Sequence, residues 1–108
     1  MPLQIIDQAL MQPVDYWSLA EVSELCEIAQ YEMQELMEYG ALQSDIVLGE
    51  QVYFAAQRVN DLKVACAQRR DYDLDLFSVV LVMGYLDEID KLRQQIRGYQ
   101  AQCGQAAH

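Results

Sequence analysis

Residues 18–42 contain two short helical patterns joined by a tight connection, and this segment constrains the fold more than any other. Ser18 is followed three positions later by Glu21, a capping box in which each side chain satisfies an unpaired amide at a helix start. A second helix extends to about Tyr39, and Gly40 can end it because glycine adopts positive φ at low cost. The apolar positions of the two helices recur at spacings of three and four residues: Leu19, Val22, Leu25 or Cys26, then Met33, Leu36 and Met37. The segment therefore predicts a helix-turn-helix.

The second helix of this motif would hold the residues that read DNA, but here it is acidic. It contains Glu32, Glu35 and Glu38 and neither Lys nor Arg. Residues 1–50 as a whole carry ten carboxylates and no base, whereas residues 51–108 carry seven acids and all seven bases. The net charge of −10 thus belongs to the N-terminal half, which a phosphate backbone would repel. Two interpretations remain open, a solvated acidic face or a surface matched to a basic partner.

Composition bounds the remaining possibilities. A chain of 108 residues with 53% hydrophobic content predicts one compact, folded domain. No run of about 20 apolar residues could span a membrane, and the N-terminus lacks the pattern of a secretory signal, so we expect a cytoplasmic protein. The cysteines, Cys26, Cys66 and Cys103, are widely spaced, and the one histidine is His108, so no metal-ligand set is expected. Cys26 and Cys66 are expected to be buried, reduced thiols.

An enzyme is not expected, because the carboxylates occupy solvent-facing helix positions without a nucleophile or a histidine nearby. The Glu-x-x-Glu spacing within each of the first two helices places neighbouring carboxylates on one helix face, where solvation is their simplest explanation. No cofactor and no small-molecule substrate are predicted.

The pattern after Gly40 changes from helical to extended. Ile46–Leu48 and Val52–Phe54 are two short β-prone segments around Gly49 and Glu50, which predicts a small hairpin, the wing of a winged helix. A helix is predicted from about Ala55 to Asp71. We therefore divide the domain into an N-terminal arm or short strand (1–15), a helix-turn-helix with its wing (16–54) and a helical part (55–108).

The last helix is predicted to begin after the N-cap Asp75 and to extend over about 76–100. Apolar side chains alternate along it at spacings of three and four, the pattern of a coiled-coil seam: Val82, Tyr85, Ile89, Leu92, Ile96 and Tyr99. A seam of this length can pack on the chain's own helices or against a second copy. We favour a homodimer, and the spacing does not decide between a parallel and an antiparallel pair.

The order of these elements resembles the MerR-like architecture, a winged helix-turn-helix followed by two further helices. It is most similar to the chaperone-modulator family, a branch that includes the modulator of the curved-DNA-binding J-domain co-chaperone. The similarity extends from about Trp17 to Arg97 and includes the capping segment, the wing strand Val52–Phe54 and the sequence "LDEIDKLR" at Leu86–Arg93. Glu27 departs from the pattern, because relatives commonly have glycine in that turn.

The resemblance implies a fold that is mainly α, with a small β wing and a long C-terminal dimerisation helix. It also implies a function: binding the J-domain of a DnaJ-like co-chaperone and restraining its stimulation of Hsp70. The alternative is a MerR-like DNA-binding transcriptional regulator, which the missing arginines disfavour.

Two acidic surfaces could bind the basic J-domain. The first lies on the helix-turn-helix and comprises Glu21, Glu24, Glu32, Glu35 and Glu38. The second surrounds the last helix and comprises Asp71, Asp73, Asp75, Asp87, Glu88 and Asp90. Charge density favours the first surface, whereas the resemblance favours Asp87 and Glu88, which lie in the "LDEIDKLR" segment.

Overall fold

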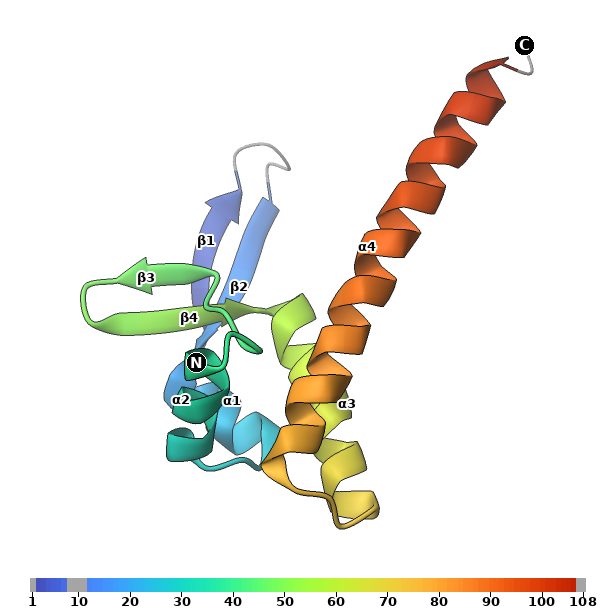
Figure 1. Cartoon of the computed structure of the whole chain (residues 1–108). Coiled ribbons are helices and arrows are strands. Elements are labelled where there is room, and N and C mark those ends of the chain that lie inside the picture. The colour runs from blue at the N-terminus through green and yellow to red at the C-terminus, as the bar shows by residue number, and fades with distance from the viewer. Residues whose placement is uncertain (1, 8–11, 107–108) are drawn as a thin grey trace.

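The computed structural model describes residues 2–7 and 12–106 and has a mainly helical body with one small sheet (Figure 1). The order of its elements is β1 (Leu3–Asp7), β2 (Gln12–Ser18), α1 (Leu19–Cys26), α2 (Gln30–Glu38), β3 (Ile46–Leu48), β4 (Gln51–Ala55), α3 (Ala56–Asp71) and α4 (Leu76–Ala106). This order confirms the predicted fold class, a winged helix-turn-helix followed by two helices.

The helix-turn-helix forms as its capping signals predict. The Ser18 hydroxyl accepts a hydrogen bond from the Glu21 amide (3.2 Å), and the Glu21 carboxylate accepts one from the Ser18 amide (3.0 Å). Gly40 follows α2 with φ of 78°. The turn between the helices contains Glu27 with φ of 54° and ψ of 47°, a left-handed conformation that is costly for a residue with a Cβ atom. Glutamate therefore stands where the backbone favours glycine.

One apolar core lies between α1, α2, α3, the inner face of the sheet and the first turns of α4. Its fully buried side chains are Val22, Cys26, Met33, Leu36, Leu42, Phe54, Leu62 and Val79. Ile28, in the turn between α1 and α2, also points into this core. Cys26 and Cys66 are buried free thiols, and desolvation raises the pKa of each to about 11. Both are therefore buried packing residues, as predicted.

The sheet is larger than the predicted wing. Its four strands are antiparallel in the order β1-β2-β4-β3, so that an N-terminal hairpin extends the wing β3–β4. An arm or one short strand was expected before residue 16, and two strands are present. Pro13 lies opposite Ile6 of β1, and pairing of β2 with β4 begins only at Tyr16, so the side of Pro13 away from β1 has no strand that would need an amide.

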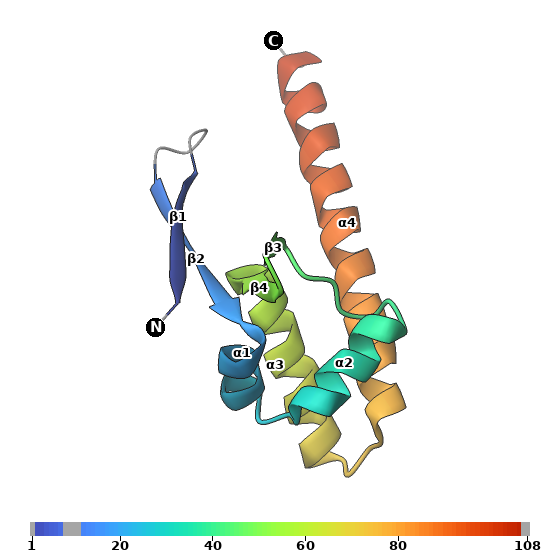
Figure 2. The same ribbon diagram turned by 90° about the vertical axis from the view of Figure 1, so that its left-hand side faces the viewer.

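Helix α4 leaves the body and projects as a single helix, about 46 Å long at 1.5 Å per residue. Asp75 caps its start, because the Asp75 carboxylate accepts a hydrogen bond from the Ser78 amide (3.2 Å). The helix continues six residues past the predicted end at 100. In the two views the N-terminal hairpin and the distal half of α4 project from the body well apart from each other (Figures 1 and 2).

Candidate partner-binding surfaces

The first predicted surface, on the helix-turn-helix, loses two of its five carboxylates to internal contacts. Glu21 is half-buried in the capping box, and the hydrogen bond from the Ser18 amide lowers its pKa. Glu32 accepts a hydrogen bond of 2.7 Å from Arg69 of α3, which lowers the pKa of Glu32 and raises that of Arg69. Glu24, Glu35 and Glu38 remain exposed on α1 and α2.

A second ion pair ties the turn of the motif to the end of α3. Arg70 lies 3.2 Å from the Glu27 carboxylate and donates a hydrogen bond to the Cys26 carbonyl (3.1 Å). The two bases closest to the helix-turn-helix, Arg69 and Arg70, are thus both engaged in contacts within the chain. They compensate the charge of the motif and hold α3 against it.

The second predicted surface divides into two separate groups. Asp71, Asp73 and Asp75 lie at the connection between α3 and α4, where Asp75 caps α4. Asp87, Glu88 and Asp90 begin three turns further along α4, about 18 Å from Asp75 at the rise of an α-helix. In the later group, Asp87 and Asp90 lie beside carboxylates from other elements.

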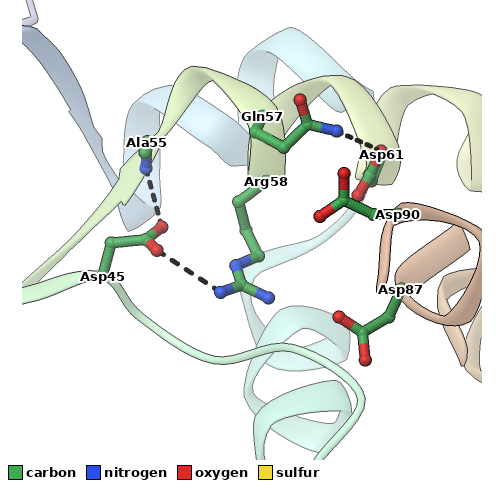
Figure 3. A pocket seen from close by; sticks show the side chains of 7 residues that line it. All are labelled: Asp45, Ala55, Gln57, Arg58, Asp61, Asp87 and Asp90. Carbon is green, nitrogen blue, oxygen red and sulfur yellow. Dashed lines mark hydrogen bonds and ion pairs between the residues drawn. The ribbon is translucent and has the colours of Figure 1, made fainter. Parts of the chain in front are cut away.

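Four aspartates converge on Arg58 in a hollow of about 150 Å³, which we call the aspartate pocket (Figure 3). It is formed by Asp45 before β3, Asp61 of α3, and Asp87 and Asp90 of α4. Arg58 donates to Asp45 at 3.3 Å, and Lys91 pairs with Asp87 at 3.0 Å on the exposed side. An adjoining hollow of about 290 Å³ shares Arg58, Asp61 and Asp87 and is bounded by the loop after α2.

Negative charge in the aspartate pocket is only partly compensated. The pKa of Asp61 is raised, first by burial and then by the nearby Asp90 carboxylate, although the Gln57 amide donates to Asp61 at 3.3 Å. Asp90 accepts a hydrogen bond from the neutral side chain of Gln94 (3.1 Å). A positive charge placed in the hollow would therefore relieve repulsion between carboxylates.

Glu88 lies apart from the pocket. It follows Asp87 by one residue, which turns it about 100° around the helix. Sequence reasoning missed Asp45, Arg58 and Asp61, because nothing in the spacing along the chain links these positions to Asp87 and Asp90.

The predicted seam of α4 is an exposed apolar face in this single chain. Five of its six residues are 43–69% exposed, namely Tyr85, Ile89, Leu92, Ile96 and Tyr99. Val82 differs, because it is partly buried and packs against the core. Phe77 and Leu81, 63% and 47% exposed, continue the face toward the start of the helix in its place. We call this set of seven exposed residues the apolar stripe: Phe77, Leu81, Tyr85, Ile89, Leu92, Ile96 and Tyr99.

The family model described as MerR HTH family regulatory protein matches residues 17–100, more than three quarters of the chain. This chain belongs to that family. No curated protein matches the sequence. The matched segment of this MerR-family chain starts at the end of β2, just before α1, and includes both acidic surfaces and most of α4.

Membership places this chain among regulatory proteins of the MerR type. In the described part of the chain, α2 presents Tyr31 (66% exposed) and glutamate side chains, and Tyr39, which follows the helix directly, is 70% exposed. Of the residues that the structure describes, four bases form ion pairs within the chain: Arg58, Arg69, Arg70 and Lys91. Among the described residues, no helix is long and apolar enough to cross a membrane, and no group of side chains is suited to hold a metal ion.

Proposed function

We propose that this MerR-family regulator acts by binding a basic protein surface, and that the partner is the J-domain of a DnaJ-like co-chaperone. The aspartate pocket is the main support for this proposal, because the segment before β3, α3 and α4 together bring four carboxylates around a single arginine. A lysine or arginine of the partner would enter this hollow and complete the compensation of charge. Electrostatic attraction of this kind sets partner choice and association rate.

The choice of a J-domain rests on the resemblance of Leu86–Arg93 to the chaperone-modulator family. Two acids of that segment, Asp87 and Asp90, line the aspartate pocket. J-domains present a basic helix to an acidic surface of Hsp70, so a protein that offers the same sign of charge can compete for that helix. The expected outcome is reduced stimulation of Hsp70.

A titration of a purified J-domain with the full chain tests this function. We expect binding that weakens steadily as salt concentration rises, because opposite charges on a solvent-exposed surface are screened. Hsp70 ATPase activity stimulated by the J-domain should fall as the chain is added. Absent binding, or binding that salt does not change, would exclude the electrostatic mechanism.

Direct DNA binding is the second candidate, favoured by the family match and by the intact packing of the helix-turn-helix. The chemistry of α2 opposes it, since each glutamate facing a phosphate repels it and no base on this helix offsets that cost. A mobility-shift assay at low salt with mixed duplex DNA distinguishes the candidates. A shift at concentrations where the J-domain does not bind would favour the DNA-binding regulator.

We further propose that the regulator is a homodimer joined through the apolar stripe. Seven large side chains on one face of α4 are exposed in the single chain, and three of them, Leu92, Ile96 and Tyr99, lie in the second half of the helix. Pairing two such faces at heptad spacing buries them as a coiled coil. Light scattering should give the mass of two chains, and Leu92→Asp should give the mass of one.

A further inference from the structure

The two outer edges of the four-stranded sheet differ in length. At one edge β3 has only three residues, Ile46–Leu48, and a short edge strand offers few groups to a further strand. At the other edge β1 has five residues, Leu3–Asp7, and lies in the hairpin that projects from the body (Figure 1). Residues 3–6 contain neither a charged side chain nor a proline. This part of β1 therefore lacks the features that keep an edge strand from pairing.

Pro13 of β2 decides which backbone groups of β1 are free. Residues that face each other in an antiparallel pair alternate between exchanging two hydrogen bonds and exchanging none. Pro13 has no amide and lies opposite Ile6, so these two residues form a pair of the second kind. By the same alternation, Gln4 and Asp15 form another such pair. The amides and carbonyls of Gln4 and Ile6 therefore point away from β2, toward the open edge, where an added strand can bind them.

The face of the sheet that is turned away from the core is apolar beside this edge. Phe54 is buried, and Trp17, its partner in the register, packs against the core. Because side chains alternate along a strand, the preceding residues, Tyr53 and Tyr16, lie on the opposite, outer face. Seven apolar or aromatic side chains from the four strands lie on this outer face and are partly or fully exposed: Leu3, Ile5, Val14, Tyr16, Ile46, Leu48 and Tyr53. An added strand with apolar side chains at alternate positions would continue this face.

A hollow of about 340 Å³ lies at the start of β1, on the side of the sheet to which Trp17 points. It is lined by Pro2, Trp17 and Leu25 and by two acids of α1, Glu21 and Glu24. Glu21 caps α1, whereas Glu24 is exposed and forms no ion pair with any base of the described ranges. An indole beside a carboxylate suits arginine or lysine, whose stem packs on the ring and whose charge meets the carboxylate.

We infer that β1 is a docking site for an extended segment of a basic protein, which adds a strand to the sheet and places an arginine or lysine in the hollow beside Trp17. Antiparallel pairing fits a sheet in which all strand pairs are antiparallel. A basic segment is favoured over a second copy of β1, because residues 1–50 carry ten carboxylates and no base. The segment has apolar side chains opposite Ile5 and Leu3, and its base follows directly, opposite Pro2. This site is separate from the aspartate pocket, so the inference does not depend on the proposed function.

The peptide GSTVTVRS has this pattern and serves as the probe. Trp17 is the single tryptophan of the chain, so its fluorescence reports on the hollow. We expect a saturable fluorescence change when the full chain is titrated with the peptide at moderate salt. In one control peptide, proline replaces the second threonine, whose amide donates to the Gln4 carbonyl, and in another, glutamate replaces arginine. Each should bind at least about tenfold more weakly. No change with GSTVTVRS, or equal binding of the proline peptide, would overturn the inference.

Gln4→Pro tests the same edge from the side of the chain. The amide of Gln4 points to the open edge, so proline there should leave the hairpin intact, and circular dichroism verifies the fold. We expect the peptide to bind Gln4→Pro at least about tenfold more weakly, and to bind Gln4→Thr, which keeps the amide, within about twofold of wild type. Equal affinities of the two variants would contradict docking on β1.

Glu24→Lys tests the hollow, and peptide binding should weaken by about threefold to tenfold. The matched control, Glu35→Lys, makes the same change of charge on α2 and should weaken binding less than about twofold. Equal losses would show that the peptide senses net charge and not the hollow. Light scattering tests the other occupant of the edge: a wild-type mass above that of two chains, which Gln4→Pro lowers, would assign β1 to a second copy and overturn the inference.

Discussion

The helix-turn-helix and the aspartate pocket are both rich in carboxylates, but they use them in opposite ways. In the helix-turn-helix, Glu21 caps α1, Glu32 binds Arg69, and Glu27 pairs with Arg70. In the pocket, four aspartates share Arg58 and the more exposed Lys91, and the pKa of Asp61 is raised rather than lowered. Three of the six glutamates in the first region therefore have partners within the chain, whereas four aspartates of the second region share two bases.

This difference shows why a count of acids does not locate a binding surface. Residues 1–50 hold ten of the seventeen acids, yet part of that charge stabilises the fold. Carboxylates that outnumber the bases beside them lie instead where the segment before β3, α3 and α4 meet. The comparison therefore favours the second predicted surface as the place where a basic partner binds. Of its residues only Asp87 and Asp90 line the pocket, and Asp45 and Asp61 join them there.

Charge reversal should separate the two regions most strongly. We expect Asp87→Lys/Asp90→Lys to weaken J-domain binding by about 10–100-fold, because each change replaces an attraction by a repulsion at the pocket. Titration at moderate salt measures the effect. The matched control, Glu35→Lys/Glu38→Lys, changes the net charge equally on exposed positions of α2, and we expect about threefold or less from general screening.

The opposite ranking of these two double variants would place the partner on the helix-turn-helix. Equal losses would mean that binding depends on net charge alone and on neither surface in particular. Both variants alter only side chains outside the buried core, so their unfolding transitions should match that of wild type.

Local signals in the sequence were sufficient for most of the fold. The capping box at Ser18 and Glu21, the stop at Gly40 and the wing at 46–54 each depend on neighbouring residues, and the structure confirms them. The N-terminal hairpin was missed because β2 contains Pro13 and Asp15, which weaken a strand pattern. The hairpin also pairs with β4, whose residues lie 35 to 39 positions later in the chain, so neighbouring residues alone do not reveal it.

The candidate site was less accessible to sequence reasoning. Spacing correctly placed Asp87 and Asp90 on the last helix, but Asp45 and Asp61 join them only through tertiary packing. Glu32 was assigned to a partner, and its contact with Arg69 spans 37 positions. The heptad pattern included Val82, although the body of the same chain covers that position. Patterns identify helix faces, and only packing decides which face meets which neighbour.

Glu32→Gln tests whether the helix-turn-helix uses its acids for stability. We expect the free energy of unfolding to fall by about 1–2 kcal/mol at neutral pH, because Arg69 loses a charged hydrogen-bond partner in a partly buried site. Urea denaturation measures it. The pKa of Glu32 is lowered in the folded state, so its contribution is present above the ordinary carboxyl pKa and disappears as pH falls through the folded value.

The matched control for Glu32→Gln is Glu35→Gln, one turn along α2 and exposed, which should change stability by less than about 0.5 kcal/mol. If the two variants were equally stable at neutral pH, the Arg69 contact would contribute nothing. Glu32 would then be available to a partner, and the contrast between the two regions would weaken.

Glu27→Gly tests the one residue of the motif whose backbone is strained. Glycine adopts the observed φ of 54° without a Cβ clash, so we expect a gain of about 1 kcal/mol, reduced slightly by loss of the exposed pair with Arg70. Glu24→Gly, inside α1, should instead lose about 1 kcal/mol. A loss at both positions would mean that the Glu27–Arg70 contact outweighs the backbone strain.

Asp61→Asn should have the smallest effect on stability and a sign opposite to that of Glu32→Gln. The folded state raises the pKa of Asp61, so ionisation of this carboxyl destabilises the fold at neutral pH. Asparagine keeps an oxygen that can accept from Gln57, and we expect a gain of about 0.5 kcal/mol or less. The gain should vanish as pH falls below the ordinary carboxyl pKa of about 4, where Asp61 is protonated in both states. J-domain binding should weaken in the same variant, because the pocket loses a charge. A variant that is more stable and also binds as well as wild type would show that Asp61 belongs to the fold and not to the binding surface.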